Sequence, residues 1–447
     1  MKKIEVFSIG LMMFSVFFGA GNLIFPPSLG QSAGGNYLPA ILGFLLTGVG
    51  LPLLGIVAIA MTGGDYPRFI ADRVHPWFSS ALLGILYLAI GPLFAIPRTG
   101  AVSFEIGIRP FIEWDDVAAV QAIYTAIFFI LTYWLALSPG KIINRVGKIL
   151  TPALLVFLAV LFLKSFLTPL GPVMEPMGVY KSFPFAQGFQ NGYLTMDLLA
   201  SLAVGAIVVG AVRSSGISEA KDIGRICLYG GLIALFLMSL VYLSLCYLGA
   251  TSSLRLGLSS NGGVILSTAA GILFGSAGQI LLAIIIALAC LTTSIGMLTA
   301  FSSYFHEATG KRIAYKKLVL GGAIFGFAAA NIGLTELIRI SLPFLVGLYP
   351  IVIILVMLTL LDSSFGGVKS VYRFSIALTA IFSIIGGLKS AGFNLAAIDS
   401  IFSFIPLYDE NLGWAIPAIV GAIFGGITKI MTSYAGASPK MENTTIK

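Results

Sequence analysis

The sequence predicts an all-α membrane protein with about twelve spanning helices. Of its 447 residues, 58% are hydrophobic and 10% are charged, whereas a soluble domain carries roughly 25% charged residues. The apolar residues gather in blocks between short polar connections, and a block of about 20 apolar residues crosses a bilayer core about 30 Å thick. Because so few charges cannot cover a globule of this size, we expect no separate soluble domain.

The apolar blocks define the predicted spans. The first runs from Val6 past Gly21 to Pro27, beyond the apolar core of about 7–15 residues in a signal peptide, which predicts an uncleaved first helix. No linker or charge run divides the chain, so we expect one membrane domain over residues 1–447. The predicted spans are 6–29, 37–62, 77–107, 117–137, 143–168, 191–212, 224–250, 277–305, 317–331, 336–361, 372–391 and 413–435.

Basic residues indicate the orientation. Most Lys and Arg residues of the connections fall on one side, among them Lys2, Arg73, Lys141 and Lys317, and basic connections stay in the cytoplasm. The pattern predicts an even number of spans. We therefore expect a multi-pass protein of the cell (inner) membrane with both termini in the cytoplasm.

The spans differ in length and regularity. The third and eighth are longer than an upright crossing needs, while glycine and polar residues interrupt the first and sixth. Within each pair the two spans lie five positions apart in the chain. Because five is odd, the two related helices run in opposite directions. This predicts two inverted five-helix repeats, residues 6–168 and 189–361, followed by two appended helices within 372–435.

The first span is interrupted at Gly19-Ala20-Gly21-Asn22. Unwound backbone is tolerated at membrane depth only where it is buried or lines a cavity. Such a break presents carbonyl oxygens to a cation, and the amides of the following half-helix to a carboxylate. Close packing of the glycines against a neighbouring helix is the alternative.

The eighth span carries three consecutive hydroxyl residues, Thr292, Thr293 and Ser294, shortly after Ala289. Three such neighbours cannot all face lipid. They either hydrogen-bond to the backbone of their own helix or supply oxygen ligands to a small cation.

Three motifs resemble a known family. The segments Gly19–Pro27, Gly91–Glu105 and Gly192–Asp197 look like the BrnQ family of branched-chain amino acid:cation symporters, and the likeness covers essentially the whole chain. More distantly, Gly21-Asn22 and Ala289–Ser294 are similar to sodium symporters of the LeuT fold. The resemblance implies a LeuT-like fold and a secondary transporter that couples inward sodium movement to uptake of leucine, isoleucine or valine by alternating access. A proton-coupled or exchange-type carrier of the same fold is the alternative.

The resemblance also implies a site, with one sodium ion between the first and eighth helices and Asn22 near the cation and the substrate carboxylate. The implied cation ligands are backbone oxygens near Ser15, Phe18 and Ala289 and the hydroxyls of Thr292 and Thr293. The implied substrate contacts are the backbone of Gly19, Ala20 and Gly21 and the side chains of Phe17, Leu198, Leu199 and Ser201. Two departures from the LeuT pattern, the missing basic gate residue after Asn22 and the apolar Leu199, argue against a second sodium site.

Charged residues also occur within or beside the spans. Arg98 and Glu105 are seven residues apart, and Glu336 and Arg339 are one turn apart. Intramembrane charges usually pair and face inward, so we expect two structural pairs, with an ion relay as the alternative. Asp197 lies in the interrupted sixth span, where it either contacts the substrate amine or the cation, or only caps a half-helix.

The sequence argues against an enzyme, a channel and a nucleic-acid-binding protein. Cys227, Cys246 and Cys290 have no metal-binding spacing, and His75 and His306 lie at loop edges without a cluster. The basic residues form no patch, and interrupted helices are untypical of a channel. Because a Gly-x-x-x-x-Gly-Lys-[Ser/Thr] motif is absent, we expect an ion gradient as the energy source, sodium as the coupling ion, the lipid bilayer as surroundings and no cofactor.

Overall fold

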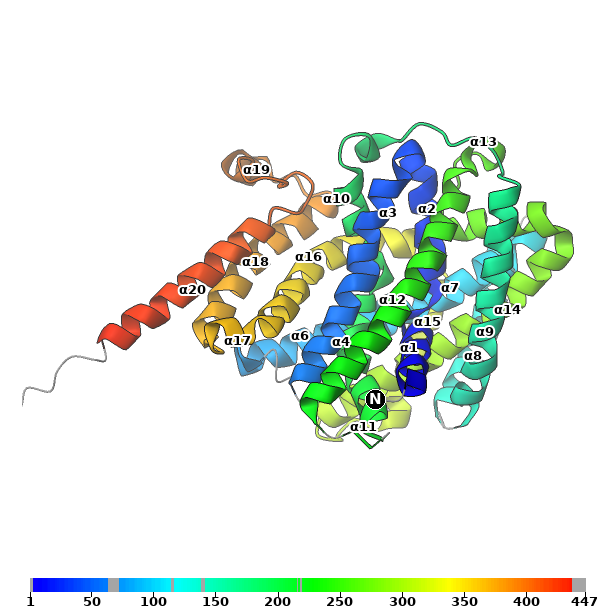
Figure 1. Cartoon of the computed structure of the whole chain (residues 1–447). Helices are drawn as coiled ribbons and strands as arrows, with labels where there is room; N and C mark the ends of the chain where they lie inside the picture. The colour runs from blue at the N-terminus through cyan, green and yellow to red at the C-terminus, as the bar shows by residue number, and fades with distance from the viewer. Residues whose placement is uncertain are drawn as a thin grey trace, which may run out of the picture.

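A computed structural model describes residues 3–62, 72–113, 116–137, 141–214, 216–217 and 219–435. Within these ranges the regular elements are helices and none is a strand (Figure 1). Eight helical segments are long and apolar enough to cross a membrane, and shorter apolar helices occur at Val6–Phe17, Leu154–Leu167 and Ala415–Thr428. The predicted all-α, multi-span architecture is therefore confirmed.

Each predicted span coincides with a helix or with a group of successive helices. In the first half of the chain these are α1 (Lys3–Phe17) with α2 (Ala20–Ala33); η1 (Gly34–Asn36), α3 (Tyr37–Leu45), η2 (Leu46–Gly50) and α4 (Leu51–Met61); α6 (Pro76–Leu88), η3 (Ala89–Leu93), α7 (Ala95–Gly107) and η4 (Arg109–Phe111); α8 (Val117–Ala136); and α9 (Lys141–Leu167).

The second half follows the same pattern. Its elements are η5 (Gly178–Lys181), α10 (Pro184–Asn191), η6 (Gly192–Thr195) and α11 (Asp197–Ser214); α12 (Ala220–Ala250) and α13 (Ser253–Leu256); α14 (Gly262–Ala308); α15 (Tyr315–Ala330); α16 (Leu334–Leu360) and α17 (Asp362–Phe365); α18 (Lys369–Ser390) and α19 (Ala396–Phe402); and α20 (Ala415–Ala435).

Two boundaries differ from the prediction. The sixth span begins with α10 at Pro184, because the polar residues of this short helix masked it in the hydropathy pattern while its Gly188 packs against the backbone of Ala40. The predicted connection 251–276 contains the first part of α14, which bends at Gly275. A φ of 68° there suits glycine, which has no Cβ to clash.

The predicted breaks in the first and sixth spans are present. Gly19 separates α1 from α2 with an extended backbone (φ −126°, ψ −168°). Met196 separates η6 from α11 with a left-handed backbone (φ 61°), a conformation that costs a residue with a Cβ about 1–2 kcal/mol. In Figure 1, α2 and α10 lie in the upper half of the bundle, whereas α1 and α11 lie in the lower half. Each span is thus divided into two half-helices.

Glycines bring the upper half-helices into backbone contact with their neighbours. A Cβ on Gly30 in α2 would lie 1.9 Å from the backbone oxygen of Cys246 in α12, and one on Gly249 would lie 2.0 Å from that of Pro27. The helix α10 approaches α3 in the same way, since a Cβ on Gly43 would lie 2.1 Å from the Phe185 oxygen. Small residues at such contacts are typical of helix pairs in membranes.

The appended helices form a separate layer. The helix α18 packs between α16 and α20, and α18 and α20 extend to the left of the bundle in Figure 1. The appended helices meet the rest of the chain mainly through α16. The half-helices near the breaks are therefore positioned by the other spans. The predicted repeat boundaries, 6–168 and 189–361, stay a prediction.

The contact between α2 and α12 predicts an effect on stability. We expect Gly30→Ala to lower the apparent melting temperature of the purified protein by a few degrees, because overpacking costs about 1–3 kcal/mol. Gly84→Ala is the matched control, since a Cβ at that position would meet no atom within 4 Å beyond the adjacent backbone of its own helix. Equal melting temperatures for the two variants would contradict the packing described here.

Candidate functional site

The two helix breaks meet at a hydrogen bond between Asn22 and Asp197. Asn22 lies in the first turn of α2 and Asp197 is the first residue of α11. The Asn22 Nδ2 donates to Asp197 Oδ2 at 2.6 Å, and the two residues are only 1% and 4% exposed. The Asn22 Oδ1 also accepts from the backbone amide of Gly19 at 3.1 Å. One side chain thereby joins both breaks.

Two hydroxyl groups complete this cluster. The Asn22 amide also donates to the hydroxyl of Tyr242, a fully buried residue of α12. The Thr195 hydroxyl accepts from the Asp197 amide at 3.3 Å and donates to the Gly192 oxygen at 2.9 Å. The carboxylate of Asp197 is thus directed across the break toward α2. Among the described residues, no amide of α11 donates to it, so it does not act as a simple helix cap.

The sequence did not indicate Tyr242, which lies in an apolar block without any distinguishing pattern. Thr195 belongs to the Gly192–Asp197 motif, and its position two residues before Asp197 was the signal available for it. The polar cluster therefore consists of two residues predicted for the site and two that only the fold assigns to it.

The predicted cation residues lie where the first and eighth spans meet. A Cβ on Gly19 would lie 3.5 Å from Thr293 Cγ2 and 3.8 Å from its Oγ1. The Thr292 hydroxyl donates to the Ala289 oxygen at 2.9 Å. Phe18, directly after α1, stacks on Phe14 with ring centroids 5.0 Å apart. The hydroxyl segment of α14 and the break of the first span are therefore neighbours.

The predicted substrate residues divide into two groups. Ala20 and Gly21 begin α2 beside Asn22, and Phe17 ends α1 next to the break. Ser201, in contrast, faces α4: a Cβ on Gly55 would lie 2.2 Å from its Oγ and 3.5 Å from a methyl carbon of Leu198. Ser201 and Leu198 therefore lie against α4, and Leu199 is fully buried in α11.

Arg98 and Glu105 do not form the predicted pair. Arg98 Nη2 donates to Ser341 Oγ at 3.2 Å, and its Nη1 donates to the Leu194 oxygen. Glu105 instead accepts from Asn261 Nδ2 at 3.3 Å. Seven residues span about 10 Å along a helix, so the two side chains lie at different depths of α7 and reach different neighbours.

Glu336 and Arg339 do pair, with 3.5 Å between Arg339 Nη1 and Glu336 Oε2. Both are exposed in the first turns of α16, with 48% and 79% of their side chains accessible. An exposed pair of this kind contributes at most about 1 kcal/mol. The contact is therefore a feature of the helix end rather than part of the buried site.

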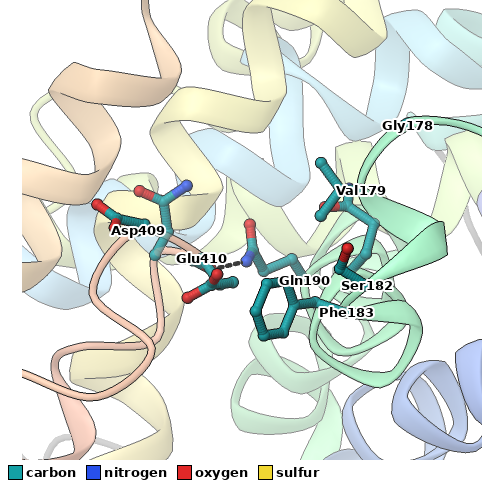
Figure 2. Close-up of a pocket in the computed structure, with 9 residues that line it drawn as sticks. Gly178, Val179, Ser182, Phe183, Gln190, Asp409 and Glu410 are labelled. Carbon is teal, nitrogen blue, oxygen red and sulfur yellow. Dashed lines mark hydrogen bonds between the residues drawn. The ribbon is translucent and has the colours of Figure 1, made fainter.

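A separate hollow of about 570 Å³ lies between α10 and the segment before α20 (Figure 2). Gln190 of α10 donates from its Nε2 to the Glu410 backbone oxygen at its edge. The lining shares no residue with the predicted site; it consists of Gly178, Val179, Ser182, Phe183, Gln187, Gln190, Asp409, Glu410 and Asn411. No group of three or more metal-ligating side chains occurs among the residues that the structure covers.

Comparison with known proteins identifies the family of the chain. Residues 2–432 match the family described as "Branched-chain amino acid transport protein". The chain belongs to this family. It is 46% identical over 433 residues to the branched-chain amino acid permease BrnQ of Bacillus subtilis, covering 96% of this chain and 98% of that protein. It is 42% identical over 426 residues to the branched-chain amino acid transport system 2 carrier protein of Pseudomonas aeruginosa, with 95% of each covered. The expected relationship to BrnQ is confirmed.

The fold is that of a known transporter. The chain matches the structure of Mhp1 with a TM-score of 0.62 at 14% identity. Mhp1 is a nucleobase-cation-symport-1 family transporter, and this structure has it in a closed conformation with bromovinylhydantoin bound. The match covers 96% of this chain and 93% of Mhp1, and an inward-facing form matches with 0.61. Mhp1 has the LeuT fold, so the LeuT-like architecture is confirmed and the protein is a multi-pass membrane transporter of this family.

The bond between Asn22 and Asp197 predicts energetic coupling. Each of Asn22→Ala and Asp197→Ala leaves a buried polar partner unsatisfied, which costs about 1–3 kcal/mol. In the double variant neither partner remains, so we expect a loss smaller than the sum of the single losses by about 0.5–3 kcal/mol. The apparent melting temperatures of the four purified proteins provide the measurement. Strictly additive shifts would mean that the contact adds nothing to stability.

Proposed function

We propose that this protein is a secondary transporter that carries leucine, isoleucine or valine into the cytoplasm together with sodium. The single observation that carries the proposal is the meeting of the two helix breaks at Asn22 and Asp197, because broken helices at corresponding positions are the best pointer to a transporter's binding site. The names of the relatives, which are branched-chain amino acid carriers, supply the substrate class. The function is transport without covalent chemistry.

The zwitterionic head of an amino acid suits the two half-helices. The amides at the start of α2, at Ala20 and Gly21, lie at the positive end of a helix and favour a carboxylate. The carboxylate of Asp197, which faces α2 rather than its own helix, is the group that attracts the ammonium. Apolar residues beside the breaks, such as Phe17 and Leu199, surround a branched aliphatic side chain.

The sodium ion occupies the junction of the first and eighth spans. Oxygen ligands suit a hard cation, and the backbone oxygens near Ser15, Phe18 and Ala289 lie on the two helices that Gly19 and Thr293 bring together. The hydroxyls of Thr292 and Thr293 add side-chain oxygens. In this arrangement the cation fixes the break of the first span in the conformation that binds the substrate.

Coupling follows from this shared break. A cation that favours the substrate-binding conformation raises substrate affinity, and the substrate raises cation affinity by the same factor. Glycine contacts hold α2 to α12 and α10 to α3. Movement of α1 and α11 against these pairs opens the site toward the side on which α1 and α11 lie.

Proton coupling is the second candidate, because one observation favours it. Asp197 is a buried carboxylate that accepts from Asn22 and lies beside Tyr242, and a group of this kind is able to hold a transported proton. Sodium coupling is preferred because the hydroxyls of the eighth span lie against the first break.

Transport into proteoliposomes distinguishes the two couplings. With purified protein and radiolabelled leucine, we expect an inward sodium gradient to drive accumulation above the equilibrium level, and an inward proton gradient without sodium to drive none. The reverse result would establish proton coupling. Uptake that only equilibrates under both gradients would contradict secondary active transport altogether, and exchange would be recognised by a requirement for internal amino acid.

Removing the hydroxyl next to Gly19 tests the cation site. Thr293→Val keeps the shape of the side chain but loses one oxygen ligand, so we expect the half-saturating sodium concentration for leucine uptake to rise at least about tenfold, or about 1.4 kcal/mol. Thr132→Val in α8 is the matched control, because Thr132 hydrogen-bonds to the Phe128 oxygen of its own helix. Unchanged sodium dependence in Thr293→Val would exclude this hydroxyl as a ligand.

A further inference from the structure

Arg98 of α7 is a buried cation that makes no ion pair with a carboxylate among the described residues, and Asp197 attracts it only from beyond contact distance. The residue is 3% exposed. Its Nη1 and Nη2 donate to neutral groups, the Leu194 oxygen and the Ser341 hydroxyl, and its Nε has no hydrogen-bond partner. Burying a charge is costly unless it is paired, so an anion that joins Arg98 would be strongly favoured.

The guanidinium lies at the two helix breaks. A Cβ on Gly21, in the first turn of α2, would lie 3.5 Å from Arg98 Nη1, and the guanidinium carbon is 5.1 Å from the centre of the Phe25 ring. On its other side, Leu194 belongs to η6, the short element that precedes Asp197. Arg98 thus stands beside the α2 amides and the sixth-span break at once.

We infer that Arg98 binds the carboxylate of the transported amino acid. A guanidinium is a planar fork of donors that matches a carboxylate, its Nε is free to donate, and the start of α2 adds a positive end to the same region. Arg98 and Asp197 then provide opposite charges for the two ends of a zwitterion. The transporter accordingly selects α-amino acids over amines and over carboxylic acids of the same side chain. This inference rests on the proposed function.

The test compares leucine with leucinamide, which has the same side chain and amine but no carboxylate. Purified protein in nanodiscs is incubated with radiolabelled leucine at pH 7, and either ligand competes. We expect the original protein to prefer leucine by at least about 100-fold. In Arg98→Gln we expect leucine affinity to fall about 10- to 100-fold, because losing a hydrogen bond between charged groups lowers affinity by about this factor. We expect leucinamide affinity to change less than about threefold, because leucinamide has no carboxylate.

Two variants control for structural effects. Arg312→Gln removes an exposed arginine from the connection before α15 and is expected to leave both affinities unchanged. Arg98→Lys keeps the charge but not the fork, so leucine affinity is expected to fall by about tenfold with leucinamide unaffected. If the melting temperature of Arg98→Gln shows that this variant does not fold, Arg98→Lys replaces it in the comparison of leucine with leucinamide.

Three results would overturn the inference. Equal losses for leucine and leucinamide would make Arg98 a positioning residue. Recovery of leucine binding in the double variant Arg98→Gln with Asp197→Asn would mean that Arg98 only balances the charge of Asp197. Unchanged leucine affinity in Arg98→Gln would exclude any role. Failure of the original protein to bind any branched-chain amino acid would instead contradict the proposed function itself.

Discussion

The hydrogen bond between Asn22 and Asp197 is the contact on which the arrangement of the site depends. It crosses from the first span to the sixth, between residues 175 positions apart in the chain, and it occurs where both helices are interrupted. In a bilayer, backbone groups freed by such interruptions must find partners inside the protein. Asn22 supplies one partner by accepting from the Gly19 amide, and it positions Asp197 by donating to it. The polar cluster therefore both satisfies the breaks and orients the charged groups around them.

Close packing around the cluster explains how it is held at this depth. The backbone contacts at Gly30 and Gly249 fix α2 against α12, the helix that also carries Tyr242. A side chain at either glycine would push the helices apart and separate Asn22 from the Tyr242 hydroxyl. Under the proposed function, sodium, substrate and helix movement would be linked through one small region, because a shift of the first break changes the surroundings of Thr293, Asp197 and Arg98 together.

The sequence predicted most of the fold and part of the site. Hydropathy and basic residues were sufficient for the spans, and glycine with polar residues marked both breaks, because these signals are local. The proximity of Gly19 to Thr293 could be expected from the resemblance to the LeuT fold. The position of Arg98 did not follow, since its neighbours Leu194 and Ser341 come from other spans and local spacing suggested Glu105 instead. The role of Ser201 at the substrate stays a prediction, and its contact with Gly55 depends on packing between α11 and α4, which local sequence does not indicate.

The most direct measurement is a cryo-electron microscopy structure of the protein in nanodiscs with saturating leucine and sodium. We expect density for leucine between the start of α2, Asp197 and Arg98, with the carboxylate toward Arg98 and a sodium ion beside Thr293. Density for leucine only in the hollow between α10 and the segment before α20, with the Asn22 cluster unchanged, would contradict this expectation.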